Sequence, residues 1–98
     1  MTYEEFRQSA SDPSSLPPEG ISQPLLALWH DAHGSWTEAH HCTQQDSGRD
    51  SAWVHAYLHR KEGDLGNARH WYGCAGRKMP AGTLEEEWAD LARALLAS

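Results

Sequence analysis

The sequence is constrained most by a dense alternation of signals that start and stop helices. Three capping boxes, each a Ser or Thr followed three residues later by Glu, begin at Thr2, Ser35 and Thr83. Glycines that can end a helix follow the expected helical segments, at Gly34, Gly63 and Gly76. Between these signals the apolar residues recur at helical spacing, and no segment of strand length alternates apolar with polar residues. We therefore predict an all-α fold.

The length limits the chain to one hydrophobic core, because 98 residues bury too little surface to divide between two domains. We expect a single helical domain over residues 1–98. Its expected parts are a short N-terminal helix and arm at 1–23, hairpin one at 24–46, hairpin two at 50–76 and a capping helix at 84–97. The second helix of hairpin one is expected to run to about Asp46.

An internal repeat relates the two expected hairpins. An offset of 29 residues aligns Gly34 with Gly63, and it also aligns Ala27 with Ala56, His30 with His59, Ala39 with Ala68 and His41 with His70. Small residues at matching positions let paired helices approach closely, and one glycine in each unit turns the chain. The pattern predicts two helical hairpins stacked side by side.

Hairpin two resembles a tetratricopeptide repeat. The small packing residues, the interhelix glycine, the aromatic residue and the terminal proline of that motif correspond to Ala56, Gly63, Ala68, Tyr72, Ala75 and Pro80. Hairpin one departs from the motif at Thr43 and Asp46, where the motif has an aromatic and a small residue. The resemblance implies two stacked tetratricopeptide-like helical hairpins.

A wider part of the chain, from Ala27 to Gly76, resembles a family of small uncharacterised bacterial proteins. The main matching segments are Ala27–Ala32 and Trp53–Asp64. Shorter matches stand at Gly34, Trp36, Ala39, His40, Asn67, Ala68, Trp71, Tyr72, Ala75 and Gly76. The resemblance implies a bacterial protein, and it brings no established activity with it.

Charge and composition argue against nucleic-acid and membrane partners. The net charge is −6, with −3 in residues 1–23, −3 in residues 83–98 and none between them, whereas a nucleic-acid-binding face must be basic. No run approaches 18 apolar residues, and the N-terminus is acidic where a signal peptide is basic. Cys42 and Cys74 are too far apart for a Cys-x-x-Cys site, so we expect reduced thiols in a cytoplasmic protein.

All seven histidines lie in the electrically neutral middle of the chain. His55 and His59 are four residues apart, so they share one face of a helix and can hold one metal ion. Zinc needs at least a third protein ligand, for which His30, Asp31 and His40 are the candidates. We place the expected metal site at His55, His59 and His30, although the glutamate of a His-Glu-x-x-His protease motif is absent.

Two other interpretations of these residues stay open. The histidines can act as polar struts that pack within or between hairpins, while most of the five tryptophans fill the core. They can also line a ligand pocket that combines imidazole, carboxylate and indole groups. The residues of that expected binding surface are His30, Asp31, His40, His55, His59, Trp29 and Trp53.

We favour a non-enzymatic domain that binds a protein, peptide or small ligand on this surface, without a resident cofactor. The first alternative is a small metal-binding or His/Asp acid-base enzyme that uses His30, His55 and His59, with a divalent metal such as zinc or with Asp31 holding a histidine as general base. The second alternative is a purely structural histidine cluster in an oligomer. Two hairpins bury little lateral surface, so the sequence leaves a homodimer open.

Overall fold

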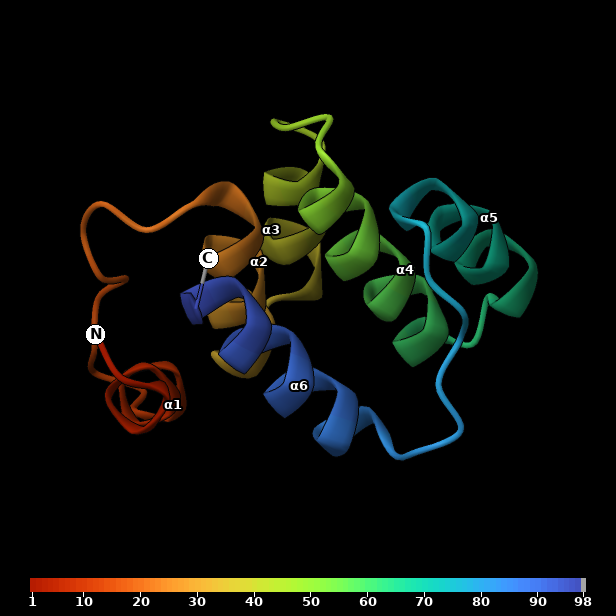
Figure 1. Ribbon diagram of the computed structural model, residues 1–98. Helices are drawn as coiled ribbons and strands as arrows, with labels where there is room; N and C mark the ends of the chain where they lie inside the picture. The colour runs from red at the N-terminus through yellow and green to blue at the C-terminus, as the bar shows by residue number, and fades with distance from the viewer. Residues whose placement is uncertain (98) are drawn as a thin grey trace.

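The computed structural model describes residues 1–97 and shows an all-α architecture (Figure 1). Six helices follow one another in the described chain: α1 (Tyr3–Ser11), α2 (Gln23–Ala32), α3 (Trp36–Thr43), α4 (Arg49–Glu62), α5 (Leu65–Ala75) and α6 (Leu84–Ala97). No strand occurs in residues 1–97, so the all-helical prediction is confirmed. Within the same residues, no helix combines the length and the apolar character needed to cross a bilayer.

The capping signals form largely as the sequence predicts. Thr2 and Glu5 exchange two hydrogen bonds, each side chain accepting from the backbone N–H of the other residue. Thr83 and Glu86 make the same reciprocal pair at the start of α6. Ser35 makes half of its box, because its hydroxyl oxygen accepts from the N–H three residues ahead. These local bonds satisfy backbone donors that a helix N-terminus leaves unpaired.

The prediction that the second helix of hairpin one reaches Asp46 is wrong. The helix α3 ends at Thr43, three residues earlier. The Asp46 carboxylate accepts hydrogen bonds from the Gly48 N–H and from the Ser51 hydroxyl, at 3.1 and 2.9 Å. An aspartate that bonds to the backbone two residues ahead forms a turn, so Asp46 leads the chain into α4.

The four helices of the middle segment form two pairs, and one of them, α4, is central to the fold. α2 packs on α3, and α4 packs on α5; the turns within these pairs contain Gly34 and Gly63, with positive φ values of 103° and 90°. A residue with a Cβ atom is strained in this conformation. α4 lies between α3 and α5, whose backbones stay apart, and it also contacts α2 and α6 (Figure 1). Every residue of α4 from Ser51 to His59 is buried.

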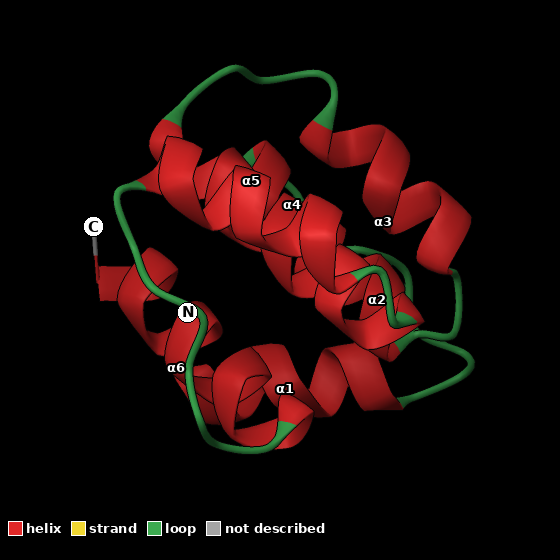
Figure 2. Ribbon diagram, turned by 90° about the vertical axis from the view of Figure 1, so that its right-hand side faces the viewer, coloured by secondary structure: helices red, strands yellow, loops and turns green. Residues whose placement is uncertain are grey.

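The helices α1 and α6 lie next to each other and cover α2 (Figure 2). Phe6 of α1 is fully buried, and its ring stacks on Trp88 of α6 with ring centroids 5.7 Å apart. In the arm between α1 and α2, Ile21 packs against the core while Leu16 is 83% exposed. The arm is therefore anchored at its end nearest α2.

A buried polar link joins α6 to α4 and α5. Glu87 of α6 is 3% exposed, and its carboxylate accepts from the Tyr72 hydroxyl at 2.6 and 2.8 Å. The Arg60 guanidinium donates to the same carboxylate at 2.9 Å, and it also donates to the carbonyl of Gly82. A buried charge is tolerable only when it is paired and hydrogen-bonded, and Glu87 meets both conditions.

Candidate functional site

Three histidines converge between the neighbouring helices α3 and α4. His40 lies on α3, and His55 and His59 lie one turn apart on α4. One ring nitrogen from each residue lies within 4.8 Å of the others. His55 and His59 are each 6% exposed, and His40 is half-buried. We call these residues the three-histidine cluster.

Two of these rings are bonded directly to each other. The Nε2 atoms of His40 and His55 are 2.9 Å apart, so one imidazole donates and the other accepts. This bond requires a ring with a free lone pair. Burial, together with repulsion from His40, His59 and His70, lowers the pKa of His55 to about 4. Burial, aided by the charge of His59, also lowers the pKa of His40. His55 is thus neutral at pH 7, and neutral imidazole is the form that binds metals.

The third histidine is oriented by polar neighbours at the end of α4. The Nδ1 of His59 is 2.5 Å from the Glu62 carboxylate, and its Nε2 is 3.3 Å from the Asn67 side-chain amide. A carboxylate on one ring nitrogen is the common outer partner of a histidine that binds metal through the other. His59, Glu62 and Asp64 form a second group with metal-binding spacing, but the Asp64 carboxylate already caps α5.

Two indole rings pack against the three-histidine cluster. Trp36 stacks on His40, with ring centroids 4.8 Å apart and planes inclined by 12°, and it meets His59 edge-on. Trp71 of α5 stacks on His55 at 4.0 Å and 15°. The indole N–H of Trp36 is held at 2.9 Å by a backbone carbonyl of α4. The rings limit the freedom of the imidazoles and restrict the access of water.

The expected metal set of His30, His55 and His59 is not the set that the fold brings together. Within residues 1–97, neither group with metal-binding spacing contains His30, and the group that joins His55 to His59 is completed by His40. His30 lies half-buried on α2, with its ring edge-on to Trp29 at 5.3 Å. Because α3 lies alongside α4, the third imidazole comes from α3 rather than from the repeat-equivalent position on α2.

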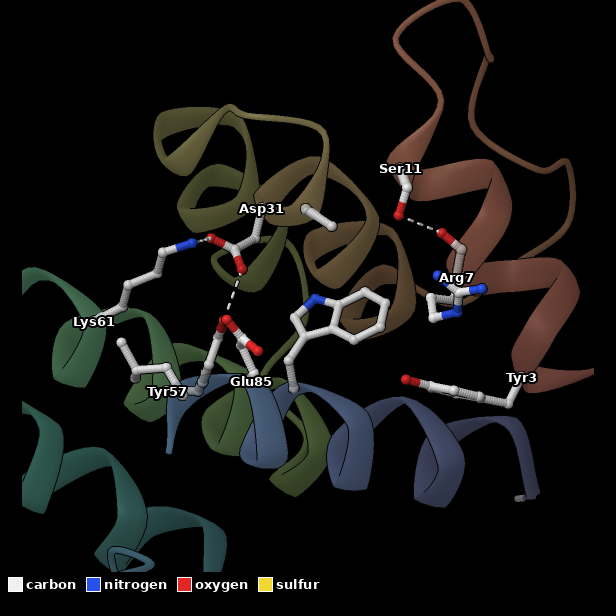
Figure 3. A pocket seen from close by; sticks show the side chains of 10 residues that line it. Tyr3, Arg7, Ser11, Asp31, Tyr57, Lys61 and Glu85 are labelled. Carbon is white, nitrogen blue, oxygen red and sulfur yellow. Dashed lines mark hydrogen bonds and ion pairs between the residues drawn. The ribbon is translucent and has the colours of Figure 1, made fainter. Parts of the chain in front are cut away.

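Asp31 lies in a separate hollow of about 640 Å³ and does not hold a histidine (Figure 3). Its carboxylate accepts from the Tyr57 hydroxyl at 2.9 Å and from the Lys61 ammonium at 2.8 Å. Burial and the charge of Asp31 raise the pKa of Tyr57, so this hydroxyl remains a donor. Arg7 and Tyr3 lie across the hollow (Figure 3). The expected histidine–aspartate acid-base pair is therefore not formed by Asp31.

The tryptophans expected in the binding surface lie elsewhere, and two others take their place. Trp29 is 2% exposed and donates its indole N–H to the Ser9 hydroxyl of α1. Trp53 lies under the Arg77 guanidinium, 3.4 Å from its ring centroid. Trp36 and Trp71 enclose the cluster instead. Trp36 precedes His40 by four residues, a spacing that was visible in the sequence. The contact of Trp71 depends on how α5 docks.

A hollow of about 460 Å³ opens beside His55, between the end of α3, the start of α4 and the end of α5. We call it the α3–α5 hollow. It is lined by Thr43 and Gln44 on α3 and the turn after it, by Ala52 and His55 on α4, and by Trp71 and Cys74 on α5, with the 46–49 segment at its rim. The three-histidine cluster therefore shares one residue, His55, with a cavity that a small molecule can enter.

Comparison with models of protein families, with curated proteins and with solved structures finds no match to this chain.

Proposed function

We propose that this protein binds a divalent transition-metal ion, zinc in the first instance, at the three-histidine cluster. The observation that carries the proposal is the convergence of one ring nitrogen each from His40, His55 and His59 within 4.8 Å. Imidazole nitrogen is a preferred ligand of zinc, and three protein ligands with one open position are typical of sites that react or exchange ligands.

The spacing of the nitrogens is close to what a tetrahedral ion needs. Zinc–nitrogen bonds of about 2.0–2.1 Å place two ligand nitrogens about 3.4 Å apart. The Nε2 atoms of His40 and His55 are closer than this, at 2.9 Å, and the widest separation within the cluster is at most 4.8 Å. Small rotations of the rings span the difference. The ring that donates the His40–His55 hydrogen bond changes tautomer, so that its proton moves to Nδ1 and both Nε2 lone pairs are free for the ion.

The surroundings of the cluster favour a bound ion over a purely structural role. Burial lowers the pKa of His55 and His40. The folded protein therefore loses stability in acid, and apolar side chains at these positions would avoid that loss. The Glu62 carboxylate already holds one nitrogen of His59 in the manner of an outer partner of a metal ligand. These features fit a site in which His40 and His55 are kept neutral and His59 is oriented.

We also propose that the two helix pairs are tetratricopeptide-like repeats. The pairs α2–α3 and α4–α5 each turn through a left-handed glycine, 29 residues apart in sequence. The small residues aligned by this offset, Ala27 with Ala56 and Ala39 with Ala68, are all fully buried. Equal burial at equivalent positions supports a repeated packing unit.

Zinc titration of the tag-free, chelator-treated protein tests the proposed function. We expect saturation at one ion per chain by calorimetry. We also expect a gain in unfolding free energy of about 2.7 kcal/mol when free zinc exceeds the dissociation constant by roughly a hundredfold. Replacing His40 by Gln removes one ligand from a half-buried position and should abolish saturable binding.

The matched control is His30→Gln, the same chemical change at a half-buried histidine outside the cluster, which should keep the parent affinity. Histidine-ring NMR resonances of the parent protein give a readout that needs no mutation. The proposal is refuted if the parent protein shows no saturable zinc binding, or if the His40 and His30 variants bind alike.

A further inference from the structure

The α3–α5 hollow borders the three-histidine cluster at His55 and extends one helical turn from it. On α3 and the turn after it, Thr43 and Gln44 follow His40 by three and four residues. On α4, Ala52 precedes His55 by three residues. Residues three or four apart in a helix are neighbours on one face. The hollow therefore adjoins the side of the cluster where His40 and His55 meet.

Of the three histidines, only His55 lines the hollow. His59 lies one turn further along α4, at 6% exposure, with the Glu62 carboxylate on its Nδ1 and the edge of Trp36 against its ring. The cavity that borders the cluster is the hollow, which His55 lines together with Trp71, whose ring stacks on that of His55.

The hollow is lined by one carboxylate, Asp46, and one guanidinium, Arg49, whose charges cancel while no ion is bound. Arg49 lines the hollow, and within residues 1–97 no carboxylate lies within 4 Å of its guanidinium. Asp46 also lines the hollow, and its carboxylate is already engaged by a backbone N–H and the hydroxyl of Ser51. Three neutral imidazoles leave a divalent ion with its full charge. Binding the ion thus makes the site strongly positive.

We infer that the metal-loaded protein binds a small oxyanion, of the carboxylate or phosphate class, at the fourth position of the ion, with Arg49 as its second contact. This inference rests on the proposed metal site. An oxyanion supplies the negative charge that the loaded site lacks, and a guanidinium is the side chain best suited to a second oxygen of the same group. The metal-free protein, whose hollow is nearly neutral, should not bind such ions.

Cobalt substitution tests the inference, because the visible bands of Co²⁺ report the number and type of its ligands. We expect one equivalent of Co²⁺ to give the absorption of a four- or five-coordinate ion, and acetate or inorganic phosphate to shift these bands saturably. Arg49→Gln should weaken the apparent anion affinity roughly fivefold or more, as for loss of one exposed charge contact. Arg69→Gln, at an exposed site on α5 outside the hollow, should leave the affinity unchanged.

The outcomes separate this inference from the proposed function. If cobalt produces no such bands, the metal site itself is refuted and the inference fails with it. If cobalt binds but neither anion shifts the bands, the metal site stands and the oxyanion site is refuted. Equal anion affinities of the Arg49 and Arg69 variants overturn the assignment of Arg49.

Discussion

The buried imidazole of His55 should make the metal-free protein lose stability in mild acid. The pKa of His55 is about 4 in the folded protein, against 6.5 for an ordinary histidine. Between these pH values the unfolded chain binds a proton that the folded chain does not. Stability is therefore fully present above about pH 6.5 and falls as the pH drops towards 4. A difference of this size amounts to about 3 kcal/mol in total, of which about 2 kcal/mol is lost between pH 7 and pH 5.

Urea unfolding in the presence of a chelator, followed by circular dichroism at several pH values, measures this loss. Histidines 40, 59 and 70 repel the charged form of His55. The slope in the parent protein therefore reflects coupled groups, and a variant is needed to isolate the part due to His55. His55→Gln keeps a neutral polar side chain, and its stability should fall by about 2 kcal/mol less than the parent over the same pH interval.

His41→Gln is the matched control, since His41 is exposed on the adjoining helix α3. This variant should keep the pH dependence of the parent. If the parent and the His55 variant lose the same stability between pH 7 and pH 5, burial does not hold His55 neutral, and the reasoning is wrong.

Three further predictions concern the fold. Glu87→Ala leaves the buried Tyr72 hydroxyl and the half-buried Arg60 guanidinium without their shared partner. It should lower the unfolding free energy by about 3–5 kcal/mol in urea denaturation, and a smaller loss would contradict a strong buried interaction. Gly63→Ala, at φ +90°, should destabilise by about 1–2 kcal/mol. Gly73→Ala, in the last turn of α5 and with no atom within 4 Å of its added Cβ, should stabilise by about 0.5–1 kcal/mol in the same assay. A double-mutant cycle of Asp31→Ala with Tyr57→Phe should give a coupling energy of about 1–2 kcal/mol, and additive effects would show that their hydrogen bond contributes nothing.

The local signals of the sequence predicted the helices well, because each signal acts between residues that are close in the chain. A capping box joins residues three apart, as Thr2 and Glu5 show, and a left-handed glycine turn such as Gly63 depends only on its own backbone. The exception, the early end of α3, arose because Asp46 bonds forward to Gly48 and Ser51.

The composition of the candidate site could be only half predicted. The spacing of four residues placed His55 and His59 on one face of α4 without any knowledge of packing. The choice of His40 over His30 as the third imidazole required the structure, because it depends on which helix lies against that face. The same is true of Trp71, which reaches His55 only through the docking of α5 on α4.

The sequence by itself determined that this chain is helical, where most of its helices begin and end, and that two imidazoles share one helical face. Only the tertiary structure decided which side chains complete that pair, and it assigned Asp31 to Lys61 and Tyr57. The physical reason is the range of the interactions. Caps and helical spacing are set within one or two turns, whereas the cluster depends on the relative position of α3, α4 and α5, which the packing of the whole core determines.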